Sequence, residues 1–163
     1  MHALRTPELD APPLVRYGNP EYVRRDNPAA GAEFTEAIGG KYRVRLVCLF
    51  CRLVTDATAA NRQLRLEYRD DADRVYYVSA PPVTFPASET HDFSFSAWQG
   101  QADWTGLLPV VAPLSPILLP PSHDFHIEVD NIQVTDQLSL ISFVWERFYT
   151  GLDGDLPLPP GLT

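Results

Sequence analysis

The sequence lacks any long hydrophobic run. Its longest uninterrupted apolar stretch is Leu46–Cys51, whereas a helix that spans a bilayer needs about 20 apolar residues. The N-terminus is polar and does not resemble a signal peptide. We therefore expect no membrane contact, and a chain that stays in the cytoplasm where it is made until it joins something larger.

Positive charge is scarce beyond residue 69. The chain has 13 basic and 21 acidic residues, a net charge of −8, which argues against direct binding of nucleic acid by general electrostatics. Residues 1–69 hold 11 of the basic residues and 8 of the acidic ones, whereas residues 70–163 hold 2 and 13. The asymmetry fits either a solvated surface with scattered charges or a positive N-terminal segment that docks on the acidic surface of a neighbouring copy or partner.

Proline is absent from two long stretches. Of the 16 prolines, five fall in residues 1–28 and three in residues 157–160, but none falls in residues 29–80 or 122–156. Proline has no backbone donor and is largely excluded from central strands, so the proline-free stretches predict the sheet. No window of twelve or more residues has the period of an amphipathic helix.

In the middle of the chain the apolar residues recur with a period of two. One face of the first predicted strand carries Tyr42, Val44, Leu46, Cys48 and Phe50. Later alternating runs cover residues 64–69, 75–79, 92–97 and 125–130. Residues 138–148 are apolar on both faces, as in a central strand. Residues 70–74 predict a hairpin, and the proline-interrupted residues 107–121 predict edge strands or an extended connection.

Six to eight such strands predict an all-β chain, an antiparallel β-sandwich of which the jelly roll is one form. We place this domain at residues 41–148, between an extended N-terminal arm, residues 1–40, and an extended C-terminal tail, residues 149–163. The arm keeps no period, but its apolar side chains gain from burial on their own domain or on a neighbour. The arm residues predicted to bind a partner are Leu14, Val15, Tyr17, Tyr22, Val23, Arg24, Arg25 and Phe34.

The candidate metal ligands are poorly spaced. Cys48 and Cys51 stand three apart on a predicted strand, so their sulfurs point to opposite faces and we expect two buried free thiols. His123 and His126 diverge in the same way, and nothing in the sequence brings them to the cysteines. Acid-rich turns within residues 70–73, 130–136 and 153–155 match no helical calcium loop and are interpreted as solvated turns. We expect no metal site and no cofactor.

Two tryptophans offer an alternative site. Trp98 and Trp104 lie in a loop-like stretch and are candidates for an exposed sugar-binding platform, although large aromatics more often fill cores or interfaces. For catalysis, the sequence has no nucleophile elbow, no phosphate-cradling glycine loop and no paired His–Glu helix motif. We expect no catalytic residues and no enzyme.

Short motifs give the chain a family resemblance. The segments that carry it are residues 27–35 (NPAAGAEFT), 41–46, 55–62 (TDATAANR), 64–70 and 136–141. They resemble small proteins encoded among the virion genes of tailed bacteriophages, in which a PAAG-E stretch precedes the first strand and an A-x-x-ANR turn leads into the second. A GD-x-I turn leads into the family's last strand, and Thr135 stands here in place of its glycine. The resemblance covers about residues 27–148 and implies a virion β-sandwich without catalytic residues.

The expected function is therefore that of a virion structural protein, assembled in the host cytoplasm, that binds and stabilises a capsid or head–tail assembly. Capsid decoration, the head–tail neck and the base of a head fibre are all open. The expected partners are other virion proteins (capsid, portal, neck or fibre subunits) and further copies of the chain. The alternative is a carbohydrate- or host-surface-binding module that uses Trp98 and Trp104.

Overall fold

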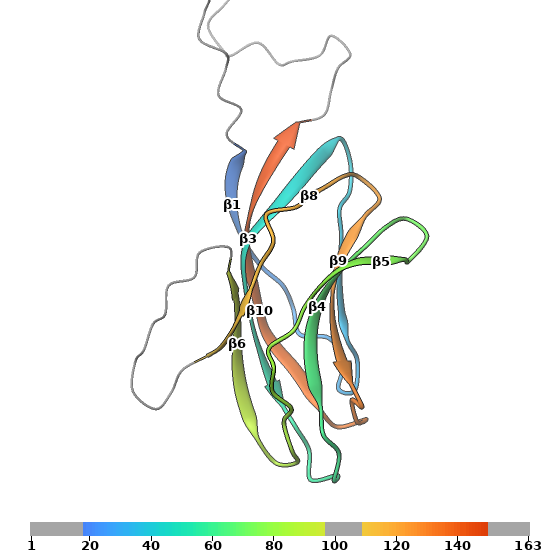
Figure 1. Cartoon of the computed structure of the whole chain (residues 1–163), viewed down its shortest axis with the longest axis vertical. Helices are drawn as coiled ribbons and strands as arrows, with labels where there is room; N and C mark the ends of the chain where they lie inside the picture. The colour runs from blue at the N-terminus through green and yellow to red at the C-terminus, as the bar shows by residue number, and fades with distance from the viewer. Residues whose placement is uncertain (1–17, 97–108, 150–163) are drawn as a thin grey trace, which may run out of the picture.

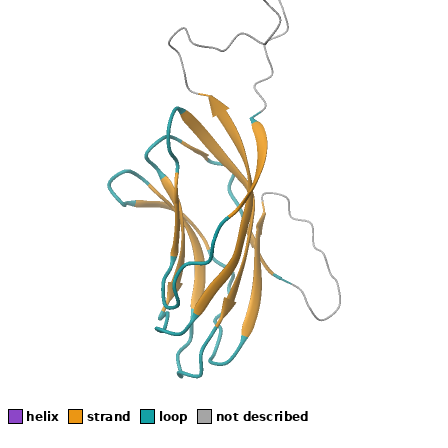
Figure 2. Ribbon diagram, turned by 180° about the vertical axis from the view of Figure 1, so that it is seen from behind, coloured by secondary structure: helices purple, strands orange, loops and turns teal. Residues whose placement is uncertain are grey.

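The computed structural model describes residues 18–96 and 109–149. All the regular secondary structure in these ranges is β-strand. Ten strands form two sheets that pack face to face (Figures 1 and 2), so the predicted all-β sandwich is confirmed. No helix in these ranges is long and apolar enough to cross a membrane.

The larger sheet has the order β1-β10-β3-β6-β7, with β8 also beside β3. Its strands are β1 (Asn19–Arg24), β3 (Tyr42–Val54), β6 (Thr90–Ser96), β7 (Val110–Pro113), β8 (Leu118–Leu119) and β10 (Gln137–Tyr149). The smaller sheet has the order β2-β9-β4-β5. Its strands are β2 (Phe34–Ala37), β4 (Gln63–Arg69), β5 (Val75–Ser79) and β9 (Asp124–Asp130).

The strands pair in a nested order once the short β7 and β8 are set aside. The first strand pairs with the last (β1 with β10), the second with the second to last (β2 with β9), then β3 with β6 and β4 with β5, all antiparallel. A long antiparallel ribbon that rolls up alternately into two sheets has this order, which is that of a jelly roll. The strand order thus agrees with the jelly-roll form that the sequence allowed.

The inward faces of the two sheets form the core. As the period of two predicts, the inward residues of β4, β6 and β9 are buried, all of them 2% exposed or less. They are Leu64, Leu66, Tyr68, Phe93, Phe95, Phe125, Ile127 and Val129. Phe125 of one sheet meets Phe143 of the other edge to face, with ring centroids 5.0 Å apart.

The prediction of which β3 residues face the core is correct up to Leu46 and wrong after Val47. Leu46 pairs with Trp145, and Cys48 pairs with Val144, so Val47 is an unpaired extra residue in a β-bulge. A one-residue insertion exchanges the two faces of the strand that follows it. The inward residues beyond the bulge are therefore Leu49, Cys51 and Leu53, while Cys48 and Phe50 are half-buried.

The predicted domain boundary at residue 41 is also wrong, since residues 19–37 contribute two strands to the sandwich. β1 pairs with β10 along its whole length, and β2 pairs with β9. Val23 and Phe34 are 7% and 9% exposed and belong to the core. These strands have 6 and 4 residues, and Pro20 lies in the first, so a two-residue period is too short-lived there to stand out in the sequence.

The predictions of a hairpin at residues 70–74 and of an edge strand within residues 107–121 are confirmed. Asp70–Arg74 joins β4 to β5 as a hairpin, closed by the Asp70 carboxylate, which accepts hydrogen bonds from the backbone of Ala72 and Arg74 at 2.9 and 3.0 Å. The proline-interrupted stretch contains β7, at the edge of the larger sheet, and the two-residue β8.

Part of the charge asymmetry along the sequence is balanced by ion pairs within the fold. The nested order places β3 and β4 beside strands from the second half of the chain, so basic residues of the first half meet acidic residues of the second. The ion pairs are Arg45–Glu146, Arg52–Asp92, Arg62–Asp136, Arg65–Glu128, Arg65–Asp130 and Arg69–Glu128. These arginines therefore give no support to a positive segment that docks on a neighbour.

Candidate functional site

The β1–β2, β3–β4 and β9–β10 connections lie at the lower end of the sandwich in Figure 1. Arg62, from the β3–β4 connection, bonds to Asp136 of the β9–β10 connection. The Arg62 side chain is fully buried, and all five of its N–H groups donate hydrogen bonds. The acceptors are Asp136 at 2.9 and 3.0 Å, Asp56 at 2.6 Å, and the carbonyl oxygens of Thr58 and Ala60 at 2.8 and 2.7 Å. Hydrogen bonding to Asp136 outweighs desolvation and raises the pKa of Arg62, so the guanidinium stays charged.

Asp136, in the β9–β10 connection, also bonds to the β3–β4 and β1–β2 connections. Its carboxylate, also fully buried, accepts the backbone N–H of Asp56 at 2.7 Å, and its backbone carbonyl accepts the N–H of Gly31 at 2.7 Å. We call Gly31, Asp56, Arg62 and Asp136 the loop-end network. The segments 27–35, 55–62 and 136–141, which carry much of the phage resemblance, therefore touch one another in the fold.

The residue at position 31 is restricted to glycine by its backbone. Gly31 has a φ of +72°, in the left-handed region that side chains with a Cβ disfavour. A Cβ at this position would lie 2.7 Å from the Cα of Val134. The β1–β2 connection can thus pass close to the β9–β10 turn only with glycine here. Arg62 and Asp136 are fully buried and Arg62 has no spare donor, so this pair holds the connections together and leaves no donor of Arg62 for a ligand.

A second charged cluster lies on the solvent side of the smaller sheet. Every second residue of β9 points outward, and all four are ionisable. The outward residues of β4 that follow Gln63 are Arg65, Glu67 and Arg69. We call these seven residues the outer face: Arg65, Glu67, Arg69, Asp124, His126, Glu128 and Asp130. Arg65 pairs with Glu67, Glu128 and Asp130 at 2.6, 3.0 and 2.6 Å.

Arg69 forms further ion pairs on the outer face. It pairs with Glu67 at 2.8 Å and with Glu128 at 2.6 Å. Burial raises the pKa of Glu67, but the hydrogen bonds from Arg69 and Arg65 outweigh it and leave this pKa below its usual value. Asp124 lacks such a partner: its Oδ1 is buried without a hydrogen bond in the described part of the chain, and burial raises its pKa.

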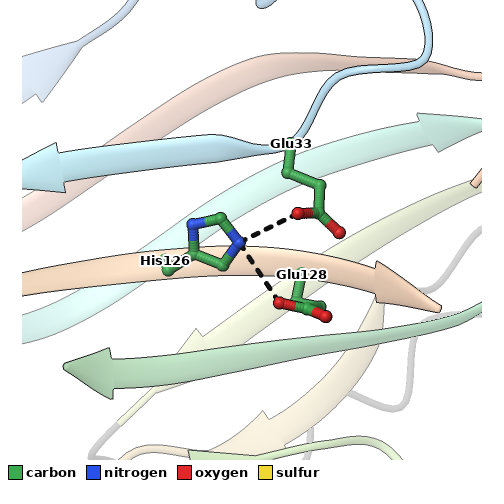
Figure 3. Close-up of side chains that lie close together, drawn as sticks. All are labelled: Glu33, His126 and Glu128. Carbon is green, nitrogen blue, oxygen red and sulfur yellow. Dashed lines mark hydrogen bonds and ion pairs between the residues drawn. The ribbon is translucent and has the colours of Figure 1, made fainter. Parts of the chain in front are cut away.

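His126 brings two carboxylates together on the outer face (Figure 3). Its Nε2 lies 3.2 Å from Oε2 of Glu33, which precedes β2, and 3.4 Å from Oε2 of Glu128. The imidazole is 8% exposed, whereas the two carboxylate side chains are 30% and 25% exposed. Glu33, His126 and Glu128 each offer one donor atom, and these atoms lie within 4.8 Å of one another. This is the one place in the described ranges where three potential metal ligands meet.

A shallow cavity of about 280 Å3 lies where β1 begins and β10 ends. Its lining includes Tyr42, Trp145, Arg147 and Glu21, but the two aromatic rings are already engaged. The Arg147 guanidinium lies 4.0 Å from the centroid of the Tyr42 ring, and Trp145, 8% exposed, donates its indole N–H to Glu21 at 3.0 Å. That bond, with one from Arg147, lowers the pKa of Glu21. Arg147 thus occupies one face of the Tyr42 ring, and Trp145 is too buried to stack on a sugar.

The residues predicted to bind a partner fall into three groups: those outside the described residues, those buried or ion-paired within the chain, and those that are exposed. Leu14, Val15 and Tyr17 lie outside the described residues. Val23 and Phe34 do not fit that role, because they are buried in the chain's own core, and Arg25 forms an ion pair with Glu36 across the gap between the sheet edges. Of the predicted residues that the structure describes, Tyr22, 68% exposed, and Arg24 are exposed on β1 and stay candidates for partner binding.

The other predicted site residues fall as follows. Cys48 and Cys51 are both free, as expected, but only Cys51 is buried, and burial raises the pKa of its thiol. His123 and His126 do not approach them: His123 stacks edge-on against Tyr76, and His126 joins the glutamates. Trp98 and Trp104 lie outside the described residues, so the carbohydrate alternative stays a prediction.

Sequence reasoning missed the Glu33–His126–Glu128 cluster. Two of its members could have been found, since residues 126 and 128 of one strand share a face. The third, Glu33, is 93 residues away from His126 in the chain and reaches it only through the β2–β9 pairing.

The strand order is that of a jelly-roll β-sandwich. The chain matches no family model, and no curated protein is similar enough in sequence to match it.

Proposed function

We propose that the chain is a structural component of a phage-type virion, a jelly-roll subunit that binds other virion proteins. The observation that carries the proposal is the contact of Arg62 with Asp136, at 2.9 Å. It joins the A-x-x-ANR motif to the turn that corresponds to the family's GD-x-I motif, 74 residues later in the chain. The Gly31–Asp136 hydrogen bond adds the PAAG-E motif to the same network.

The Arg62–Asp136 contact gives the resemblance more support than the separate motifs do. Three short motifs that are scattered along a sequence agree easily by chance. Motifs whose residues bond to one another describe one structural unit, in which each residue is needed by the others. The jelly roll, a fold used by viral capsid proteins and lectins among others, is compatible with the proposal but does not by itself point to it.

The surface proposed for binding is the free edge of β1 together with the residues before it. β1 pairs with β10 on one side only within the described residues, so the other side presents backbone N–H and C=O groups to a partner. Tyr22 and Arg24 project from this strand. The predicted partner-binding residues Leu14, Val15 and Tyr17 directly precede it in sequence.

The test is incorporation into particles. In the phage or prophage that encodes the chain, we expect mass spectrometry of purified particles to find the full chain in many copies. A chain that lacks residues 1–17 should fold but not be incorporated. The cut stops at residue 17 because removing β1 would delete the core residue Val23 and leave the edge of β10 unpaired.

Two single substitutions give a matched pair for the same test. Tyr22→Ser should reduce incorporation, whereas Val134→Ser, at an 84% exposed position on the β9–β10 turn, should not. Absence of the full chain from purified particles would overturn the proposed function. Normal incorporation of the chain without residues 1–17 and of Tyr22→Ser would instead refute the β1 edge as the binding surface.

A further inference from the structure

We propose that Glu33, His126 and Glu128 bind one divalent metal ion of the zinc type. Nε2 of His126, Oε2 of Glu33 and Oε2 of Glu128 converge on one point beside the smaller sheet (Figure 3). An imidazole nitrogen with two carboxylate oxygens is a ligand set that suits Zn2+ better than Mg2+ or Ca2+, which prefer oxygen alone.

Two of the three ligands are held in place by neighbours. Thr35, opposite His126 on β2, has its hydroxyl 2.7 Å from Nδ1 of the imidazole, which fixes the ring and directs Nε2 at the glutamates. The backbone N–H of Val129 donates to Oε1 of Glu33 at 3.0 Å and leaves Oε2 directed at His126. Such partners of the ligands orient metal sites and tune their affinity. They distinguish this cluster from carboxylates that merely share a surface.

The local charge also favours a divalent cation. Against the guanidinium groups of Arg65 and Arg69, the outer face and Glu33 together hold five carboxylates, those of Glu33, Glu67, Asp124, Glu128 and Asp130. A divalent ion would offset part of this excess negative charge. The partly exposed glutamates give the ion a path from solvent and leave room for water in its remaining positions.

Arg69 is the competitor for the ion, because it donates to the same Glu128 oxygen at 2.6 Å. The competition is not prohibitive, since Arg69 keeps its hydrogen bonds to Glu67, at 2.8 and 3.0 Å, when Glu128 turns to the ion. The bound ion would join Glu33, ahead of the edge strand β2, to the central strand β9. It would thus fasten an edge of the sandwich and stabilise the folded chain.

The experiment titrates Zn2+ into the chelator-treated full chain by isothermal calorimetry and follows the thermal midpoint by circular dichroism. We expect one ion per chain and a midpoint that rises with Zn2+. Glu33→Gln and His126→Asn should each weaken binding at least about tenfold. The control is His91→Asn, because His91 forms a similar pair with Glu89 on the larger sheet without a third ligand, and it should bind as the parent does.

Failure of the parent chain to bind Zn2+, or equal binding by Glu33→Gln, would overturn the site. Glu33→Gln decides the matter even if His126→Asn does not fold, since the amide oxygen can still accept from Val129. Arg69→Gln sharpens the test: removal of the competing cation should tighten binding about tenfold, and unchanged or weaker binding would show that Glu128 is not a ligand. The result is independent of incorporation into particles, so the two proposals can fail separately.

Discussion

The loop-end network and the outer face use the same chemistry in opposite settings. Each surrounds arginine with carboxylates, but Arg62 and Asp136 are fully buried, whereas Arg65 and Glu128 are 28% and 25% exposed. In the network, each N–H of Arg62 has one acceptor, and a lost partner cannot be replaced by water. On the outer face, Arg65 has three acidic partners and solvent beside it. The network is therefore rigid and structural, while the outer face can exchange one cation for another.

The largest effect is expected from Asp136→Ala. The substitution would leave the Arg62 charge buried without its main partner, and removing one member of a buried pair costs about 3–5 kcal/mol. Urea denaturation should show this loss as a lower midpoint with little change in slope. The double variant Arg62→Met/Asp136→Leu, which removes both charges, should recover much of the lost stability. A single variant as stable as the parent would break the distinction between the two regions.

Gly31→Ala tests the third member of the network with a smaller effect. Alanine in the left-handed region costs about 1–2 kcal/mol, and its Cβ would also press on the backbone of Val134. The control is Gly39→Ala, where a Cβ meets no atom within 4 Å and the backbone needs no positive φ, so stability should be unchanged or slightly higher. Equal denaturation midpoints for the two variants would show that the close approach at position 31 is not a constraint.

The sequence predicts the centre of the sandwich well, because long strands repeat the period of two often enough to be recognised. Leu64, Leu66 and Tyr68 face the core as expected, and so do the inward residues of β9. The prediction fails where one residue changes the register, as at the Val47 bulge. It fails again at β1 and β2, whose few residues resemble an arm until their partners, more than 80 residues later in the chain, are known.

Neither the loop-end network nor the outer face can be predicted completely from the sequence. Arg62 and Asp136 belong to recognisable motifs, but nothing in either motif tells that the two side chains meet. The outer face is half visible in the sequence, as the alternating ionisable residues of β9, yet Glu33 joins it only through the nested pairing of β2 with β9. Sites assembled across strands distant in sequence depend on topology, which local patterns do not carry.

The smallest effect, and the sharpest contrast with Asp136→Ala, is expected from Arg65→Met measured in the presence of a chelator. Arg65 is partly exposed, methionine keeps most of its apolar stem, and Arg69 still pairs with Glu67 and Glu128, so the loss should be about 1 kcal/mol or less. Solvent-exposed pairs are screened by salt, so this loss should shrink when urea denaturation is repeated in about 1 M salt. The loss from Asp136→Ala should stay nearly constant, because salt does not reach a sealed pair. An Arg65→Met penalty as large and as insensitive to salt as that of Asp136→Ala would mean that the outer face is as rigid as the loop end, with no freedom to exchange a guanidinium for a metal ion.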